Sequence, residues 1–341
     1  MAYITFQPND YFNTKLYTGT GSSNSITGVG FQPDWVWIKN RGNTESHALF
    51  DAVRGVTKRI VSNSTGAEET NANTVTAFGT DGFTVGTNAG VNGSGISTVA
   101  WNWKANGSGS SNTDGSTAST VSVNTTAGFS IVKWTGSGSA TTIGHGLGVT
   151  PKIIMLKNTS EVYGWQVYHA SLGNTKYLAL DSTDAQATSS QSWNNTSPTS
   201  TVFSVGASDS NNKSGNTIIA YCFAEKTGFS KFGSYIGNGS TWGTFVNCGF
   251  KPAWIIAKRT SDVEDWFMYD TKRDPINVAD TRLKANGNPG EATNLGVDFL
   301  SNGFKWRSNT AGYNASGSTY IYMAFAEEPV VASTGDPATA R

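Results

Sequence analysis

The chain has 341 residues, enough for two or three domains with hydrophobic cores. Charged residues make up 14% of it, and 24 Lys and Arg balance 24 Asp and Glu, so no net field attracts nucleic acid or an anionic membrane. No stretch has the roughly 18 apolar residues of a membrane span, and the N-terminus MAYITFQPND lacks the segments of a signal peptide. We therefore expect a protein made in a cytoplasm, with no nucleic-acid partner and no membrane insertion.

A ten-residue phrase occurs three times, as GFQPDWVWIK (30–39), GVTPKIIMLK (148–157) and GFKPAWIIAK (249–258). Each copy places a proline six residues before a lysine, with four consecutive apolar residues between them. The proline is expected at the start of a strand, where its missing N–H does least harm. Because the apolar residues do not alternate with polar ones, this strand should be buried on both faces, one inside a sandwich and the other under a loop, a neighbouring unit or another subunit.

Further markers keep the same register around each copy of the phrase. An aromatic residue and a Gly-x-Gly motif precede it, another aromatic follows the lysine by 11 residues, and a phenylalanine follows the proline by 50 or 52 residues. Each unit ends on an alternating apolar strand, VAWNWKA (99–105), IAYCFAE (219–225) or IYMAFAE (321–327). The aromatic markers are Tyr17, Trp134 and Tyr235; Phe50, Tyr168 and Tyr269; and Phe83, Phe203 and Phe304. These markers indicate an internal triplication.

The local pattern within each unit is typical of β-strands. Short alternating segments rich in Val, Ile, Thr and aromatic residues are separated by Gly and Asn. The stretch NANTVTAFGTDGFTVGTNAG (71–90) alternates around a Thr-Asp-Gly turn, which predicts a hairpin. Units of this length suit a two-layer antiparallel sandwich. The sequence therefore predicts an all-β chain of three tandem antiparallel β-sandwich repeats with a jelly-roll-like topology.

The predicted boundaries follow the markers and the composition. The Gly/Ser/Thr-rich stretch between the first two units is typical of a flexible linker, which would give the first unit more freedom than the other two. The predicted parts are an N-terminal segment (1–12), repeat 1 (13–105), the linker (106–128), repeat 2 (129–226), repeat 3 (229–328) and a flexible tail (329–341).

The three histidines and the Gly-x-Gly motifs give no catalytic pattern. His47, His145 and His169 are widely separated, so neither a zinc site nor a Ser-His-Asp triad is expected. The Gly-x-Gly motifs lack the Lys-Ser/Thr of a phosphate loop, and they are interpreted as turns between strands.

Recurring carboxylates leave an enzyme as the least favoured hypothesis. Asp51 and Asp270 follow the aromatic marker in two units, and glycosidases use paired carboxylates, but a turn or surface role is favoured. The clusters Asp181/Asp184 and Asp262/Asp265 do not fit an EF-hand and are interpreted as solvated loops. We expect no enzyme, no metal and no cofactor.

Three tryptophans are the candidate ligand-binding residues. Most aromatic residues recur as markers and are expected in the core, whereas Trp193, Trp242 and Trp306 stand in polar surroundings, QSWNN, GSTWGT and FKWRS. Sugar-binding modules stack pyranose rings on such side chains, so these three are predicted glycan contacts. The alternative, that each packs on its own loop, stays open.

The two cysteines are predicted to be buried, unpaired thiols. Cys222 aligns with Asn102 and Ala324, and Cys248 with Val29 and Leu147, so each is interpreted as a small or apolar filler. Cysteines in a chain made in the cytoplasm usually stay reduced.

Several runs also resemble a known repeat. AYCFAEKTGFSKFGSYIGNGS, FLSNGFKWR and YIYMAFAEEP, with GF-x-P-x-W and its lysine, resemble a repeat domain of uncharacterised structural proteins of marine tailed bacteriophages. The resemblance covers Phe12 to Pro329 and implies a β-rich module of the phage particle, without an enzymatic activity that can be carried over. The second unit departs from it, with Val149 and Ile153 where the others have Phe and Trp.

The resemblance leads to a main hypothesis and two alternatives. The main one is a virion structural protein of the tail fibre or tail tip that contributes to host attachment by contacting host-surface glycans. The alternatives are a capsid decoration or head-fibre protein with a purely structural role, and, less favoured, a polysaccharide-degrading enzyme. The expected location is the virion, assembled in the host cytoplasm, with other virion proteins as partners. The outer face of the apolar strand would be an exposed hydrophobic patch in a single unit, so it also predicts a homo-oligomer, with a trimer favoured.

Overall fold

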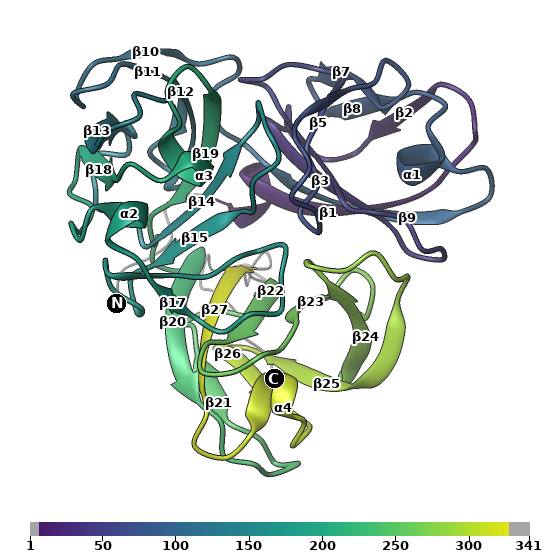
Figure 1. The fold of residues 1–341 in the computed structure, drawn as a ribbon. Coiled ribbons are helices and arrows are strands. Elements are labelled where there is room, and N and C mark those ends of the chain that lie inside the picture. Colours follow the sequence, from purple (N-terminus) through teal and green to yellow (C-terminus); the bar gives the residue numbers. More distant parts are fainter. Residues whose placement is uncertain (1–6, 327–341) are drawn as a thin grey trace, which may run out of the picture.

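The structure is a computed structural model that describes residues 7–326. It is all-β, and its named strand pairs are antiparallel. Figure 1 shows three lobes of strands that meet in the middle; we call them the first (8–105), second (106–226) and third (229–326) lobe. Residues 1–6 of the predicted N-terminal segment and the whole predicted tail (329–341) lie outside the described residues.

The first lobe begins with a short 3-10 helix, η1 (Pro8–Asp10), and contains two packed sheets. The four-stranded sheet has the order β1-β9-β3-β4, with bounds Phe12–Thr18, Ser97–Trp103, Trp35–Asn40 and Ala48–Asp51. The second sheet has the order β2-β8-β7, with bounds Asn24–Thr27, Gly82–Val85 and Val75–Gly79. The strand pair β5 (Lys58–Arg59) and β6 (Glu69–Thr70) and the helix α1 (Ala89–Asn92) complete the lobe.

The second lobe is built around a six-stranded sheet. Its order is β10-β11-β12-β19-β14-β15, with bounds Ser110–Asn112, Ser119–Asn124, Phe129–Thr135, Thr217–Phe223, Ile153–Asn158 and Gln166–His169. Two short strand pairs lie beside it, β13 (Thr141–Gly144) with β18 (Val202–Val205) and β16 (Lys176–Tyr177) with β17 (Ala187–Thr188). The helices are α2 (Ser190–Trp193) and α3 (Asp209–Asn212).

The third lobe consists of one eight-stranded sheet and the helix α4 (Ala311–Asn314). The strand order is β20-β27-β22-β23-β24-β25-β26-β21, with bounds Ser230–Ile236, Thr319–Ala326, Pro252–Arg259, Trp266–Asp270, Ala279–Lys284, Ala292–Leu300, Gly303–Trp306 and Phe245–Asn247. The sheet bends back on itself, as a contact between distant strands of the order shows: the ring of Tyr235 in β20 lies 6.3 Å from that of Phe304 in β26.

The stretch 106–128 is not the flexible linker that its composition predicted. Its strands β10 and β11 extend the sheet of the second lobe, and β11 pairs with β12 along its whole length, from Ser119 to Asn124. The prediction was wrong because it weighed Gly and Ser content above the alternating segment STVSVN, whose Thr and Val residues favour a strand. The first lobe does not have the greater freedom that a flexible linker would give it, because its side chains belong to a core that all three lobes share.

One four-strand order recurs in the three lobes. It is β1-β9-β3-β4 in the first, β12-β19-β14-β15 in the second and β20-β27-β22-β23 in the third. The recurring phrase forms the third strand of this order each time, and all six residues of β3 and of β14 are buried. The prediction of a strand buried on both faces is therefore confirmed.

Alternating residues of that strand enter two different cores. In β3, Val36 and Ile38 pack with Phe83 inside the first lobe, whereas Trp35 and Trp37 belong to the shared core between the lobes. At the centre of the shared core, three rings from β9, β19 and β27 form a triangle. Trp103 and Phe223 lie 6.5 Å apart, Phe223 and Phe325 5.8 Å, and Trp103 and Phe325 5.7 Å. The second face of the strand is thus covered within one chain.

The two cysteines are unpaired and buried, as predicted. Cys222 lies in β19 and is fully inaccessible, and Cys248 follows β21. Burial raises the pKa of the Cys248 thiol to about 12 and that of Cys222 further still, so both stay protonated at neutral pH.

Candidate functional site

Two of the three predicted glycan-contacting tryptophans are buried, so the prediction is wrong for them. Trp193 in α2 is 1% exposed, and its indole N–H donates to the carbonyl oxygen of Lys176 at 3.1 Å. Trp306 in β26 is inaccessible and stacks on Tyr313 at 4.7 Å. Trp306 shares a strand face with Phe304, two residues earlier, so alternation places it in the core despite its charged neighbours.

Trp242 is the one predicted contact that solvent reaches. It lies in the loop between β20 and β21, and 66% of its surface is exposed. Two cations approach its ring, one in β26 and one just after it: Lys305 Nζ is 4.8 Å and Arg307 Cζ 4.4 Å from the centroid. The loop is anchored at Trp242, since Asn238 Nδ2 donates to the Trp242 carbonyl oxygen at 3.1 Å. These contacts hold an aromatic surface in place at the outside of the molecule.

The Trp242 loop has an equivalent in each of the other lobes, between β1 and β2 and between β12 and β13. In all three lobes the Gly-x-Gly motif forms the turn at the start of this loop, as predicted. The first glycine has no room for a side chain, because a Cβ on Gly136 would lie 2.1 Å from the carbonyl oxygen of Lys213. The second glycine has a positive φ, +74° at Gly138. The motif therefore meets a steric need and a backbone need at the same time.

Sequence reasoning missed three buried asparagines that hold these loops. Asn212 receives the backbone N–H of Ser137 at 3.1 Å and donates to the carbonyl oxygens of Ser139 and Gly206 at 2.6 and 3.2 Å. Asn92 and Asn314 make the same kind of contacts in the other lobes. The signal was the motif Asn-x-Ser-Gly, which stands seven residues before the closing apolar strand in every unit.

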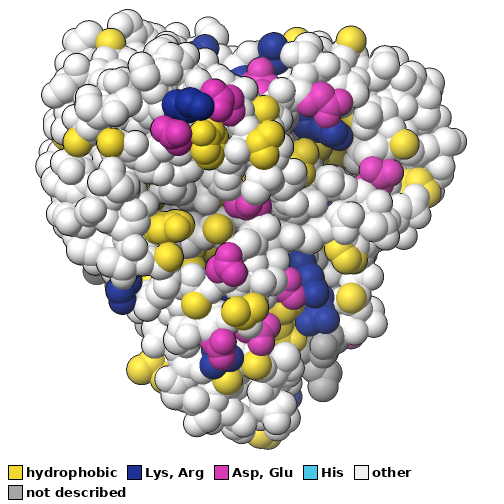
Figure 2. Space-filling view, in the orientation of Figure 1, with side chains coloured by type: hydrophobic (Ala, Val, Ile, Leu, Met, Phe, Trp, Pro, Cys, Tyr) yellow, Lys and Arg dark blue, Asp and Glu magenta, His cyan; other side chains and the backbone are white. Residues whose placement is uncertain are grey.

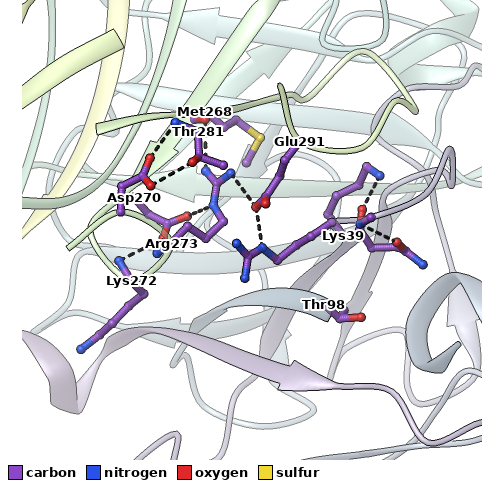
Figure 3. A network of polar contacts seen from close by, with 12 residues as sticks. Lys39, Thr98, Met268, Asp270, Lys272, Arg273, Thr281 and Glu291 are labelled. Carbon is purple, nitrogen blue, oxygen red and sulfur yellow. Dashed lines mark hydrogen bonds and ion pairs between the residues drawn. The ribbon is translucent and has the colours of Figure 1, made fainter. Parts of the chain in front are cut away.

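The carboxylates considered for catalysis are held by buried arginines. Arg273 Nε lies 2.5 Å from Asp270 Oδ2, and its other nitrogens reach Glu291 Oε1 and the carbonyl oxygen of Met268, both at 3.2 Å (Figure 3). Glu291 also binds Arg41 Nε of the first lobe at 2.5 Å. This network therefore joins the third lobe to the first.

Asp51 repeats the arrangement between the first and second lobes. Arg54 Nε lies 2.5 Å from Asp51 Oδ2, which also accepts the hydroxyl of Tyr221 at 2.7 Å. Asp51 and Asp270 thus sit at different junctions, each neutralised by its own arginine. In the second unit His169 takes this position, and its Nε2 lies 3.4 Å from the carbonyl oxygen of Tyr322 in the third lobe.

The lysine of the recurring phrase is buried in all three lobes. Lys157 Nζ donates to the carbonyl oxygen of Thr65 in the first lobe at 2.9 Å, and Lys258 Nζ to that of Thr183 in the second at 3.2 Å. Lys39 Nζ donates to the carbonyl oxygens of Asn40 and Asn43 at 2.6 and 3.4 Å. Desolvation lowers the pKa of each of the three amines to about 8.

The rest of the described surface offers little chemistry. Residues 7–326 contain no group of three or more His, Cys, Asp or Glu side chains that could hold a metal ion. No helix in that range is long and apolar enough to cross a membrane. An open polar groove of about 330 Å³ runs beside Ser111, Thr120 and Lys133. Figure 2 shows a face of mostly uncharged atoms with small, separate hydrophobic and charged patches.

A family model described as a domain of unknown function (DUF7483) matches residues 7–329, nearly the whole chain. The chain therefore belongs to this family. None of the curated proteins matches it.

Proposed function

We propose that the chain is a structural, non-enzymatic component of a bacteriophage virion. Its favoured role is in a tail fibre or tail tip, where it contacts host-surface glycans through Trp242. The observation that carries the glycan contact is a fixed aromatic side chain with 66% of its surface exposed. Trp and Tyr at such places offer a flat apolar face and a polar edge, which suit a sugar ring. The assignment to a phage particle rests on the resemblance of the repeat motifs.

We also infer that the three lobes are tandem β-sandwich repeats with a jelly-roll-like topology. The shared four-strand order and the separate cores inside the first two lobes support this inference. In the second lobe, for example, Trp134 of the large sheet packs against Phe203 of the small one at 5.7 Å. Superposition of the three lobes tests it.

The buried Asp–Arg pairs favour a binding role over hydrolysis. A glycosidase needs two carboxyl groups facing one open cleft, and one of them must exchange protons with the substrate. Asp51 and Asp270 are inaccessible, and each is bound by an arginine at a different junction. A turnover assay on host polysaccharide would reveal an enzyme by the release of reducing ends.

A capsid decoration or head-fibre protein is the second candidate. Three lobes around one core present three related faces, and such a shape fits an attachment point of three-fold symmetry. Other virion proteins would then be the partners. A homotrimer remains a further proposal, although the apolar strand that suggested it is already covered within one chain.

Two measurements separate these roles. Antibody labelling of intact virions in the electron microscope should place the protein on the tail for the first role and on the head for the second. A virion that carries no label would refute both. Binding of purified protein to host cells should weaken at least about tenfold in Trp242→Ala, and it should not change in Val162→Ala, which also alters an exposed apolar side chain.

A further inference from the structure

We propose that the outer tip of the third lobe is a binding site for an anionic sugar, a refinement that rests on the proposed glycan contact. One sugar ring stacks on Trp242, and its carboxylate or sulfate group pairs with Lys305 and Arg307. The site consists of these three residues with Ile236 and Phe245, and we call it the tip site. The expected ligand is an acidic surface polysaccharide.

The other two lobes serve as an internal comparison for the loop. Strand pairing aligns the loops, since Ile26 lies opposite Phe83, Ile143 opposite Phe203 and Val246 opposite Phe304. Between the second glycine of Gly-x-Gly and the aligned residue, the first and second lobes have four residues and the third has six. The longer loop carries Trp242, so the exposed tryptophan has no counterpart in the first two lobes.

The strand residues beside the loop differ in the same way. Phe245 lies opposite Lys305 in the third lobe, whereas the aligned pairs are Ser25 with Thr84 and Thr142 with Ser204. Arg307, two residues after Lys305, aligns with Gly86 and Gly206. Folding does not need aromatic and cationic side chains at these positions, because the equivalent strands of the first and second lobes pair with Ser, Thr and Gly there. Only the third lobe carries them, and it carries them together, which indicates a shared role.

The charges at the tip site are available to a ligand. In the described part of the chain, Lys305 has no ion-pair partner, and its ammonium group lies over the ring of Trp242. Arg307 pairs with Asp298 at 3.2 Å but keeps 28% of its side chain exposed. Two cations and one carboxylate leave the tip with a positive charge. An anion beside the ring would complement it.

The apolar part of the tip site suits a sugar face. Among the described residues, Trp242 and Phe245 are the only exposed large aromatic side chains, and Ile236, 62% exposed, ends the strand that leads into the loop. Thr244 Oγ1 donates to the Ile236 carbonyl oxygen at 2.7 Å and closes the base of the loop. Because two thirds of Trp242 is exposed, its contacts with the cations leave ring surface open for stacking.

Titration calorimetry on the full chain tests the proposal with three probes: oligogalacturonate, a sulfated dextran oligosaccharide and neutral dextran of the same length. At least one anionic probe should bind, and added salt should weaken that binding. Lys305→Gln should weaken it about fivefold at low salt, and Trp242→Ala at least about tenfold. Lys305 is the chosen cation because its removal leaves no carboxylate unpaired.

The controls separate the site from the fold. Deletion of Thr241 and Trp242 gives the loop the length found in the other lobes, so this variant should keep the wild-type melting temperature and lose binding. Lys176→Gln, a change of the same charge in the second lobe, should leave binding unchanged.

The outcomes distinguish the glycan contact at Trp242 from the specificity for anionic sugars. If neutral dextran binds through Trp242 as tightly as the anionic probes do, the glycan contact stands and the anionic specificity is wrong. If only single-stranded DNA binds, in a parallel titration, both are wrong, because the tip site then serves another polymer. Anionic binding that survives Trp242→Ala would also overturn the site.

Discussion

His47 shows how one side chain can make a junction sensitive to acid. Its Nδ1 accepts the indole N–H of Trp37 at 2.7 Å, so the proton of the neutral ring sits on Nε2, which lies 3.0 Å from the carbonyl oxygen of Lys284 in the third lobe. Protonation of Nδ1 would remove the acceptor that Trp37 needs. Burial, reinforced by the nearby cations of Lys39 and Arg273, lowers the pKa of His47 to about 3.

We predict that acid weakens the fold through this histidine. The folded pKa lies below the unfolded value of about 6.5, so the unfolded chain binds the proton first as the pH falls. Stability should then decrease between pH 6.5 and pH 3, by at most about 1.4 kcal/mol per pH unit. Urea unfolding at several pH values should show that His47→Gln is less acid-sensitive than wild type. Parallel pH profiles for the two proteins would contradict the assignment.

Lys157 should act in the opposite pH range. Burial lowers the pKa of its amine to about 8, from 10.5 in the unfolded chain, so the unfolded chain holds the proton more tightly. The stability of wild type relative to Lys157→Met should therefore rise from pH 8 to pH 10.5. A neutral amine can still donate to both of its carbonyl partners, which are Thr65 and Tyr163. Lys272→Met, the same change at an exposed position, is the control for the loss of a lysine.

At the same scale, the tryptophans show that a residue with polar neighbours in the sequence can still be buried in the fold. Trp193 and Trp306 have polar or charged neighbours in the sequence, yet both are inaccessible. For Trp306 the strand alternation with Phe304 was a usable signal, and it outweighs the charges on either side. For Trp193 no local signal existed, since a four-residue helix places it against Tyr168 at 5.6 Å.

At the scale of the element, the first Gly of Gly-x-Gly should be harder to replace than other loop glycines. Gly136→Ala places a Cβ 2.1 Å from a backbone oxygen, and the turn must open to relieve it. We expect a loss of about 2–5 kcal/mol. Gly215 has a positive φ of +80° and open space around it, so Gly215→Ala should cost only about 1–2 kcal/mol. Denaturant midpoints measure both, and equal losses would show that the close approach is unimportant.

The recurring phrase was the best predicted element of the fold. Its four apolar residues correctly indicated a strand buried on both faces. The proline begins the strand in β22, whereas Pro33 and Pro151 stand two residues before β3 and β14. The strand β11 was missed because the Gly and Ser content around it was weighed above its alternating segment STVSVN, and the short strand β10 pairs with β11. Local pattern therefore predicted the strands that face two cores better than those at a sheet edge.

At the scale of the molecule, the lobes close a ring through the same backbone contact at each junction. Each contact joins a loop amide of one lobe to the end of the phrase strand of another. The three are Glu68 N to Thr159 O at 2.8 Å, Gln186 N to Thr260 O at 2.9 Å and Glu291 N to Arg41 O at 2.8 Å. No sequence pattern predicted this closure, because a repeat shows that units are alike and does not show which faces meet.

We predict that the closed ring unfolds as one cooperative unit. Proteins with several lobes often melt in steps, because each lobe keeps its own core. Here the large sheet of every lobe buries one face in the shared core, where Trp103, Phe223 and Phe325 meet. A lobe on its own would expose that face, at roughly 1.5–3 kcal/mol for each large side chain.

Differential scanning calorimetry should therefore give one transition whose calorimetric and van't Hoff enthalpies agree. The fragment 106–226, which contains every strand of the second lobe, should expose its large sheet and bind a hydrophobic dye. Glu291→Gln, at the junction that joins the last lobe to the first, should lower the single melting temperature without splitting the peak. Two or three separate transitions in the wild-type chain would show that the lobes are stable alone, and that the shared core does not hold them together.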